Sequence, residues 1–258
     1  MTMALEHTWY MTVRYVRALV RQPWYVALTL IQPIIWLLLF GALFKKIVEI
    51  PGFASTSYIT FLTPGIVVMT AMFSGGWGGM GVIDDLDRGV MDRFLVSPVS
   101  RGSVLMGRVV QTGFVAVLQS LIMVGLAYAV GAHFPGGAPG VIMLIIAAIL
   151  LSTGIGSLSN GLALVLRREE SVIAASNFIL LPLTFLSSAF LQQNLAPRWI
   201  QDVATYNPVN WAIEVGRGAL GAQVDWTVVL SHTGYLFAFS LFCAWVSTRA
   251  FRSYQRSV

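Results

Sequence analysis

The chain has 258 residues, of which 57% are hydrophobic and only 10% are charged, with a mean hydropathy of +0.76. Because soluble domains carry about a quarter charged residues, this composition excludes a water-exposed globule, and it is too apolar for a disordered chain. An integral membrane protein remains, with room for about six crossings of roughly 20 residues each. The formal charge of +5 is usual for cytoplasmic loops of such a protein, so nucleic-acid binding is not expected. A single cysteine, Cys243, excludes an intrachain disulfide and a cysteine metal site.

A short amphipathic stretch precedes the first apolar run. Trp9, Val13 and Val20 share one helical face, with arginines beside it. The pattern predicts that residues 1–24 form a helix lying in the inner membrane interface. A plain cytoplasmic cap of the first span is the alternative. The first apolar run is too long for the core of a signal peptide, so no cleavable signal is expected.

Continuous apolar runs predict six transmembrane helices, at residues 25–44, 58–83, 109–131, 140–166, 172–191 and 229–248. Runs of this kind argue against a β-barrel, whose strands alternate over short stretches. Only the charged hairpin at residues 167–171 separates the fourth and fifth spans. The expected fold is an all-α integral membrane protein forming one transmembrane domain over residues 1–258.

The distribution of Lys and Arg predicts the orientation of these spans. With the N-terminus inside, Lys45, Lys46, Arg198 and Arg217 lie outside, and the other twelve basic residues lie in cytoplasmic parts: Arg14, Arg17, Arg21, Arg88, Arg93, Arg101, Arg108, Arg167, Arg168, Arg249, Arg252 and Arg256. Because basic residues gather on the cytoplasmic side, both termini are expected there.

Motifs for chemistry on this chain are missing from the sequence. There is no phosphate-binding loop, and His7, His133 and His232 lack metal-ligand spacing. Ser157 and Ser159 stand in a glycine-rich stretch that resembles a serine-protease turn, but small residues at this spacing more often allow close helix packing. The predicted spans also lack the ionisable residues that ion and proton pathways need. Energy for any transport is therefore expected from a partner that touches the cytoplasmic loops.

The cytoplasmic segment 84–108 reads as a charged amphipathic helix that ends before Pro98. Leu86, Val90 and Phe94 form an apolar stripe, and Arg88 is spaced to pair with acidic residues one turn away on either side. A second helix, capped by Ser100, is expected to lead into the third span. A partner-docking helix explains the exposed stripe, and a solvated loop helix is the alternative.

The sequence Asp87-Arg88-Gly89-Val90-Met91-Asp92-Arg93-Phe94-Leu95-Val96-Ser97-Pro98-Val99-Ser100-Arg101, followed by Gly107-Arg108, resembles the signature loop of type-2 permeases of ATP-binding cassette exporters. The similarity is greatest to the daunorubicin-resistance, nodulation and polysaccharide-export kinds, with Gly-Val-Met-Asp in place of a Gly-Thr-Met-Glu-like centre. Residues 182–190, 195–200 and 207–217 also resemble the family pattern before its last span.

This resemblance implies a dimeric six-span permease whose coupling helix docks on a separate ATPase subunit. The implied docking residues are Asp87, Arg88, Met91, Asp92, Arg93, Phe94 and Arg101. The resemblance also implies outer re-entrant helices over residues 192–228, with Asn207, Pro208, Glu214 and Arg217 as their notable residues, and Glu214 and Arg217 are spaced to pair. No cofactor is expected on this chain, because ATP and Mg²⁺ belong to the ATPase.

The expected function is export of an amphiphilic substrate, such as a hydrophobic drug, a lipid or a lipid-linked glycan, across the cell membrane. An apolar cargo suits the uncharged spans and their aromatic and methionine side chains: Phe40, Phe44, Met69, Met72, Phe73, Trp77, Phe178 and Phe185. Lipid contact explains the same residues. An intramembrane enzyme and a non-transporting scaffold are the alternatives, and the permease partner is a second copy or a paralogue.

Overall fold

The computed structural model describes residues 10, 12–13, 17, 23–50, 55, 57–90 and 101–255. Regular structure in these ranges is all helical, in the order α2 (Pro23–Leu43), η1 (Lys45–Glu49), α3 (Tyr58–Gly76), α4 (Met80–Asp87), α6 (Arg101–Ala129), α7 (Gly137–Leu166), α8 (Glu169–Phe185), η2 (Gln193–Leu195), α9 (Arg198–Thr205), α10 (Pro208–Leu220) and α11 (Trp226–Gln255). The predicted all-α class is confirmed. The interfacial helix predicted at 1–24 lies almost entirely outside the described residues.

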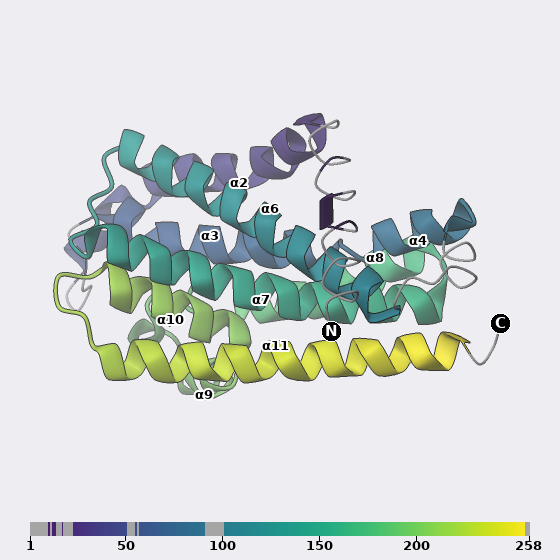
Figure 1. The fold of residues 1–258 in the computed structure, drawn as a ribbon. Coiled ribbons are helices and arrows are strands. Elements are labelled where there is room, and N and C mark those ends of the chain that lie inside the picture. Colours follow the sequence, from purple (N-terminus) through teal and green to yellow (C-terminus); the bar gives the residue numbers. More distant parts are fainter. Residues whose placement is uncertain are drawn as a thin grey trace.

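Helix α7 runs through the middle of an elongated bundle (Figure 1). It packs against α3, α6, α10 and α11, while α2 contacts α3 and α6. Leu144, Ala147, Ala148 and Leu151 of α7 are all buried. Because alanine side chains are small, the neighbouring helices can approach α7 closely at these positions. Burial on several faces explains why the sequence of α7 is apolar all round.

Within the described ranges, four helical stretches are long and apolar enough to cross a membrane: Tyr58–Asp87, Met106–Ala129, Gly137–Leu166 and Trp226–Phe251. The chain is therefore a multi-pass membrane protein. The other two predicted spans correspond to α2, whose apolar part Ala27–Leu43 is shorter, and to the 17-residue α8. The span predicted at 172–191 is too long, because α8 ends at Phe185 and an irregular segment follows. A count of six spans stays a prediction.

A turn at residues 77–79 divides the predicted second span into α3 and α4. The Gly76 carbonyl accepts hydrogen bonds from Ser159 Oγ at 2.5 Å and from Ser176 Oγ at 3.0 Å. The Gly79 N–H donates to Ser159 Oγ at 3.0 Å. A side chain on Gly79 would collide with the backbone of Ser159, so this close approach requires glycine. Hydroxyls of α7 and α8 thus hold the break between α3 and α4.

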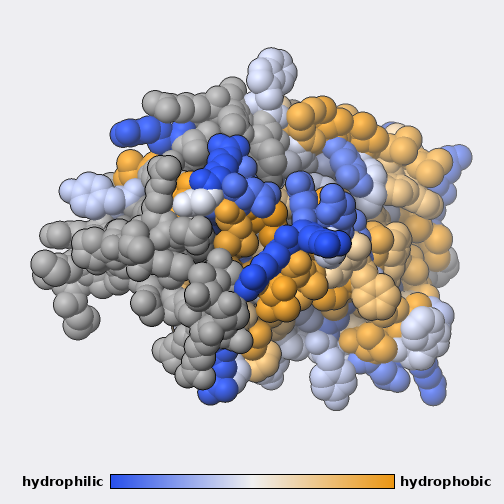
Figure 2. Space-filling view, turned by 90° about the vertical axis from the view of Figure 1, so that its right-hand side faces the viewer, coloured by the Kyte–Doolittle hydropathy of each residue, from blue (hydrophilic) through white to orange (hydrophobic). Residues whose placement is uncertain are grey.

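The two ends of the bundle differ in what they carry. At the end defined here as the α4 end lie the C-terminus of α4, the α7–α8 turn and the C-terminus of α11 (Figure 1). Arg167 makes the α7–α8 turn with a left-handed φ of 52°, so only Arg167 and Arg168 separate the two helices, as the predicted charged hairpin requires. Figure 2 looks onto this end and shows hydrophilic residues gathered beside a broad apolar flank.

At the opposite end, the α6–α7 and α10–α11 connections lie side by side (Figure 1), joined by a hydrogen bond of 3.0 Å from Gly136 N–H to the Leu220 carbonyl. Two short helices, α9 and α10, occupy the segment 192–228 for which re-entrant helices were predicted. Helix α10 packs against α3, α7 and α11 rather than lying on the surface. Its buried residues include Val209, Ile213 and Val215.

Candidate functional site

A cavity of about 380 Å³ opens between α2, α3 and α8, and it is called the aromatic cavity here. Aromatic side chains from all three helices line it: Trp36 of α2, Phe73 at the end of α3 with Trp77 in the following turn, and Phe185 of α8. The remaining lining residues are Leu28, Thr29, Gln32, Pro33, Ile66, Met69, Thr70, Ser74, Asn177 and Leu181. None of the lining residues is charged.

Several polar groups in the aromatic cavity have no internal partner. Gln32, Ser74 and Asn177 form no side-chain hydrogen bond with any residue that the structure describes, although all three are at least partly exposed. The indole N–H of Trp77 is shielded from solvent and likewise finds no acceptor among those residues. In contrast, Thr70 Oγ1 donates to the Ile66 carbonyl at 2.7 Å. An amide on an apolar span costs free energy in lipid when it has no hydrogen-bond partner. These amides therefore mark the cavity as a place where a polar group of another molecule fits.

A buried ion pair joins Asp85 of α4 to Arg108 of α6. The side chains of Asp85 and Arg108 are 9% and 8% exposed, and Arg108 Nη2 also donates to the Gly81 carbonyl at 2.5 Å. A neighbouring pair on the same helix, Asp84 with Arg88 at 2.8 Å, has side chains that are 55% and 71% exposed. The exposed pair lies within one stretch of chain and is screened by water, whereas the buried pair joins α4 to α6.

The predicted docking residues flank this pair. Asp87 and Arg88 are exposed at the end of α4, and the predicted pairing of Arg88 with Asp84 is present. Arg101 begins α6, which continues without interruption into the predicted third span. The other docking residues fall in the range 91–100, outside the part of the chain that the structure describes: Met91, Asp92, Arg93 and Phe94. Their docking role stays a prediction.

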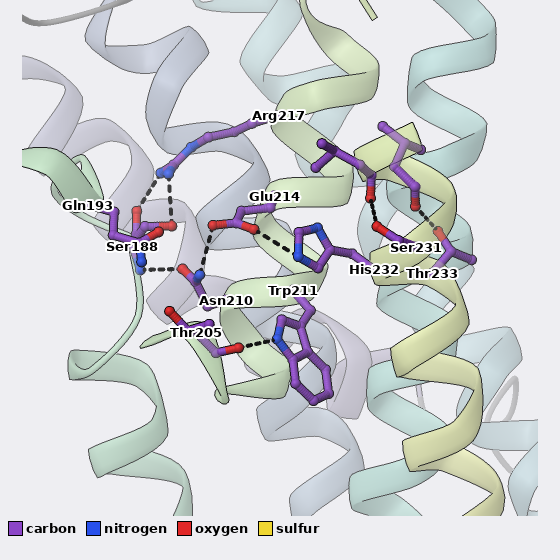
Figure 3. Close-up of polar contacts among 12 residues, drawn as sticks. Ser188, Gln193, Thr205, Asn210, Trp211, Glu214, Arg217, Ser231, His232 and Thr233 are labelled. Atoms are coloured by element: carbon purple, nitrogen blue, oxygen red, sulfur yellow. Dashed lines mark hydrogen bonds and ion pairs between the residues drawn. The ribbon is translucent and has the colours of Figure 1, made fainter. Parts of the chain in front are cut away.

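Arg217 of α10 lies within the bundle, and its guanidinium points at backbone carbonyls (Figure 3). Nη2 donates to the Ser188 carbonyl at 2.5 Å and to the Ala189 carbonyl at 3.3 Å, while Nη1 donates to Ser188 Oγ at 3.0 Å. Nε donates to the Phe61 carbonyl at 3.3 Å, and the guanidinium lies 3.7 Å from the centre of the Phe61 ring. Arg217 therefore satisfies irregular backbone that follows α8.

The predicted pairing of Glu214 with Arg217 takes the form of an electrostatic interaction, while the direct contacts of Glu214 are with other residues. Its carboxylate accepts a hydrogen bond from Asn210 Nδ2 at 2.9 Å and lies 3.3 Å from His232 Nε2 of α11. Asn210 Oδ1 in turn accepts from the Ser188 N–H at 3.0 Å (Figure 3). The i, i+3 spacing brings the two charges near each other, but the carbonyls at 188–189 compete for Arg217. These five residues, Ser188, Asn210, Glu214, Arg217 and His232, are called the α10 network.

Asn207 and Pro208 start α10 in the way their residue types favour. Asn207 Oδ1 caps the helix by accepting from the Val209 N–H at 2.9 Å, and proline occupies the first turn. Asn207 Nδ2 donates to the carbonyls of Leu183 at 2.7 Å and Leu186 at 3.0 Å. One asparagine thus begins α10 and fixes the end of α8.

The serines that suggested an intramembrane enzyme have backbone partners. Ser157 Oγ donates to the Thr153 carbonyl at 2.7 Å, and Ser159 Oγ donates to the Gly76 carbonyl at 2.5 Å. His232, the histidine of the α10 network, lies against Glu214 and not against these serines. These contacts favour the packing interpretation of the glycine-rich stretch.

Sequence reasoning missed three features of the site. It gave Asp85 no role, did not place Gln32 and Asn177 in a cavity, and named no partner for His232. A signal existed for each of them, since polar and ionisable residues near or inside apolar spans are rare and usually serve a purpose. What the sequence could not provide was the partner, because Arg108 lies 23 positions from Asp85.

Bundled apolar helices around an uncharged cavity are the architecture of a multi-pass membrane protein. Residues 6–221 match the ABC-2 type transporter family, and the chain belongs to that family. A putative transport permease, ycf38, of Cyanophora paradoxa is 30% identical over 223 residues, which cover 86% of this chain and 73% of the relative. The daunorubicin resistance ABC transporter permease protein DrrB1 of Streptomyces coeruleorubidus is 27% identical over 205 residues, or 78% of this chain and 70% of the relative.

Proposed function

We propose that this chain is the permease subunit of an exporter driven by a separate ATP-binding cassette ATPase. The observation that carries the proposal is the family match over residues 6–221, supported by the drug-resistance permeases among the relatives. The sequence contains no phosphate-binding loop. ATP and Mg²⁺ therefore bind to the partner, and this chain itself carries no cofactor and catalyses no reaction.

The part of the cytoplasmic segment 84–108 that lies between α4 and α6 is called the coupling segment here. The buried Asp85–Arg108 pair links the two helices that flank it, so the pair can transmit motion of this segment into the bundle. Because the pair fixes α4 to α6, a push on the segment between them moves both helices together. α4 continues through the break at 77–79 into α3, which lines the aromatic cavity. Docking of the ATPase on Asp87, Arg88 and the segment 91–101 thus acts on the cavity wall.

Substrate, location and assembly complete the proposal. The permease sits in the cell membrane with both termini in the cytoplasm, as the distribution of basic residues predicts. It works as a dimer with a second copy or a paralogue, among membrane lipids and without nucleic acid. Its cargo is amphiphilic, and relatives named for daunorubicin and doxorubicin resistance favour a hydrophobic drug over a lipid or a lipid-linked glycan.

Co-purification tests this function directly. The tagged permease is extracted in mild detergent from its own host, and its companions are identified by mass spectrometry. A stoichiometric partner that carries a phosphate-binding loop is the expected result. An intact permease without such a partner would contradict the proposal and favour a scaffold. Labelling of Ser157 or Ser159 by a serine-directed probe would favour an enzyme instead.

Arg93→Glu provides the variant for this experiment, with Arg198→Glu on α9 as its matched control. We expect Arg93→Glu to lose the ATPase while the helices stay folded, because a reversed charge at a small interface disturbs its register. Arg198→Glu, an equal change in charge far along the chain, should retain the ATPase. Equal ATPase recovery with both variants would contradict the docking assignment.

A further inference from the structure

We propose that the aromatic cavity is a binding site for an uncharged molecule with an aromatic body and at least one hydrogen-bonding group such as a carbonyl. This inference rests on the proposed function, whose cargo it specifies. The site is built by α2, α3 and α8, and its lining holds four aromatic rings and no charged side chain. The size of about 380 Å³ is within the range of small-molecule sites.

The aromatic rings give the site its preference for a flat apolar body. Trp36 of α2 and Phe185 of α8 both line the cavity, with Phe73 and Trp77 from the region where α3 ends. Rings of this kind contact a second aromatic system through offset or edge-to-face packing. A flexible alkyl chain gains area from the same rings but none of this geometric preference.

The polar groups distinguish a cargo molecule from an ordinary lipid tail. Gln32 and Asn177 each present an amide to the cavity, and Ser74 adds a hydroxyl, all without a side-chain hydrogen bond to the described part of the chain. An acyl chain would leave these amides unmatched in an apolar environment, which costs free energy. A carbonyl or hydroxyl on the occupant removes that cost, because an amide both donates and accepts.

The lack of charge in the lining opposes an ionised ligand, because no side chain there supplies a counter-charge. Desolvating a carboxylate or an ammonium without a counter-charge is far more expensive than desolvating a carbonyl. The ionised side chains at the two ends of the bundle do not line the cavity: Asp85 pairs with Arg108, and Arg217 is bound by carbonyls. The occupant is therefore neutral where it enters the cavity.

Trp77 belongs both to the cavity lining and to the turn through which we propose that motion of α4 reaches α3. It lines the cavity and stands in the turn between α3 and α4, and its buried indole N–H lacks an acceptor among the described residues. Because Trp77 lines the cavity, an occupant contacts the turn through which we propose that α4 moves α3.

Photolabelling with benzophenone tests the site, because benzophenone is neutral, aromatic and carries a carbonyl that inserts into nearby C–H bonds under light. The full-length permease is reconstituted in phosphatidylcholine nanodiscs, irradiated and digested, and label on peptides of α2, α3 and α8 is divided by label on the lipid-exposed α11. We expect this ratio to be well above one. We also expect 4-benzoylbenzoate, the carboxylate analogue, to leave the cavity peptides unlabelled.

Competition separates hydrogen bonding from simple hydrophobic partition. Fluorenone and fluorene have the same flat shape, but only fluorenone has a carbonyl. A net hydrogen bond of the usual strength predicts that fluorenone lowers the ratio at about three- to tenfold lower concentration than fluorene. Asn177→Leu should bring the two competitors to equal potency, while Gln223→Leu, which changes an exposed amide in the α10–α11 connection, should preserve the difference.

Three results would overturn the inference. The first is a labelling ratio near one, which is expected if lipid or a second copy fills the cavity. The second is equal potency of fluorenone and fluorene on the unaltered permease. The third is labelling of the cavity peptides by the carboxylate analogue. None of the three needs a variant, so a poorly folded Asn177→Leu protein does not protect the inference. The experiment does not involve the ATPase, so these results leave the exporter function standing if the ATPase still co-purifies.

Discussion

The α10 network and the aromatic cavity treat their polar groups in opposite ways. In the α10 network Arg217 and Asn210 each bind two or more groups, and the carbonyls after α8 are satisfied by side chains. In the aromatic cavity the amides of Gln32 and Asn177 have no side-chain hydrogen bond to a described residue. The hydrogen bonds of Arg217 and Asn210 fix backbone in place, whereas we propose that the unmatched amides of the cavity wall bind a ligand. The comparison predicts that substitutions in the two regions separate stability from binding.

The largest effect is expected at the α4 end, where the comparison extends to two ion pairs whose acidic residues are neighbours on α4. Asp85→Ala leaves the Arg108 charge buried without its carboxylate and should lower the free energy of unfolding by about 3–5 kcal/mol. Asp84→Ala removes the exposed pair with Arg88 and should cost about 0–1 kcal/mol. Unfolding of both variants by denaturing detergent in mixed micelles gives the two values. Equal losses would mean that burial of the Asp85 pair does not matter.

Arg217→Met should have the next largest effect. The substitution keeps an apolar stem but removes the donors to the carbonyls of Ser188, Ala189 and Phe61. Hydrogen bonds to a charged group contribute about 1.5–3 kcal/mol each, and they are not additive, so a loss of about 2–4 kcal/mol is expected. Thermal unfolding in detergent measures it, with the exposed Arg198→Met as the control that should change little. A stable Arg217→Met protein would show that the irregular segment does not need the hydrogen bonds from Arg217.

The break at residues 77–79 should show an intermediate effect. Ser159 bridges the Gly76 carbonyl and the Gly79 N–H, so Ser159→Ala leaves both without this partner and should cost about 1–2 kcal/mol. Ser157→Ala removes only a bond to the Thr153 carbonyl within α7 and should cost less than about 0.5 kcal/mol. Hydrogen exchange of the Gly79 amide, followed by mass spectrometry, should speed up in Ser159→Ala alone. Unchanged exchange there would show that the hydroxyl does not hold the turn.

The sequence predicted those parts of the fold that depend on local pattern. Continuous apolar runs located the long apolar helices, because the length of such a run is a property of neighbouring residues. The helix start at Asn207 and Pro208 was not predicted, although both residue types favour it. Local spacing placed Glu214 near Arg217, but it did not reveal that carbonyls of the segment after α8 bind the arginine. Contacts such as Asp85 with Arg108 depend on how distant helices pack, and no single-sequence pattern contains that information.

The smallest change in stability is expected in the aromatic cavity, and it is the sharpest test of the comparison. Asn177→Leu is close to isosteric and removes an amide without a side-chain hydrogen bond to a described residue, so the free energy of unfolding should change by less than about 0.5 kcal/mol. The same detergent unfolding used for Arg217→Met measures it. A large loss of unfolding free energy would show that Asn177 stabilises the fold through hydrogen bonds, as Arg217 does. A neutral result joined with lost preference for fluorenone would separate the two regions fully, because stability would then reside in matched groups and recognition in unmatched ones.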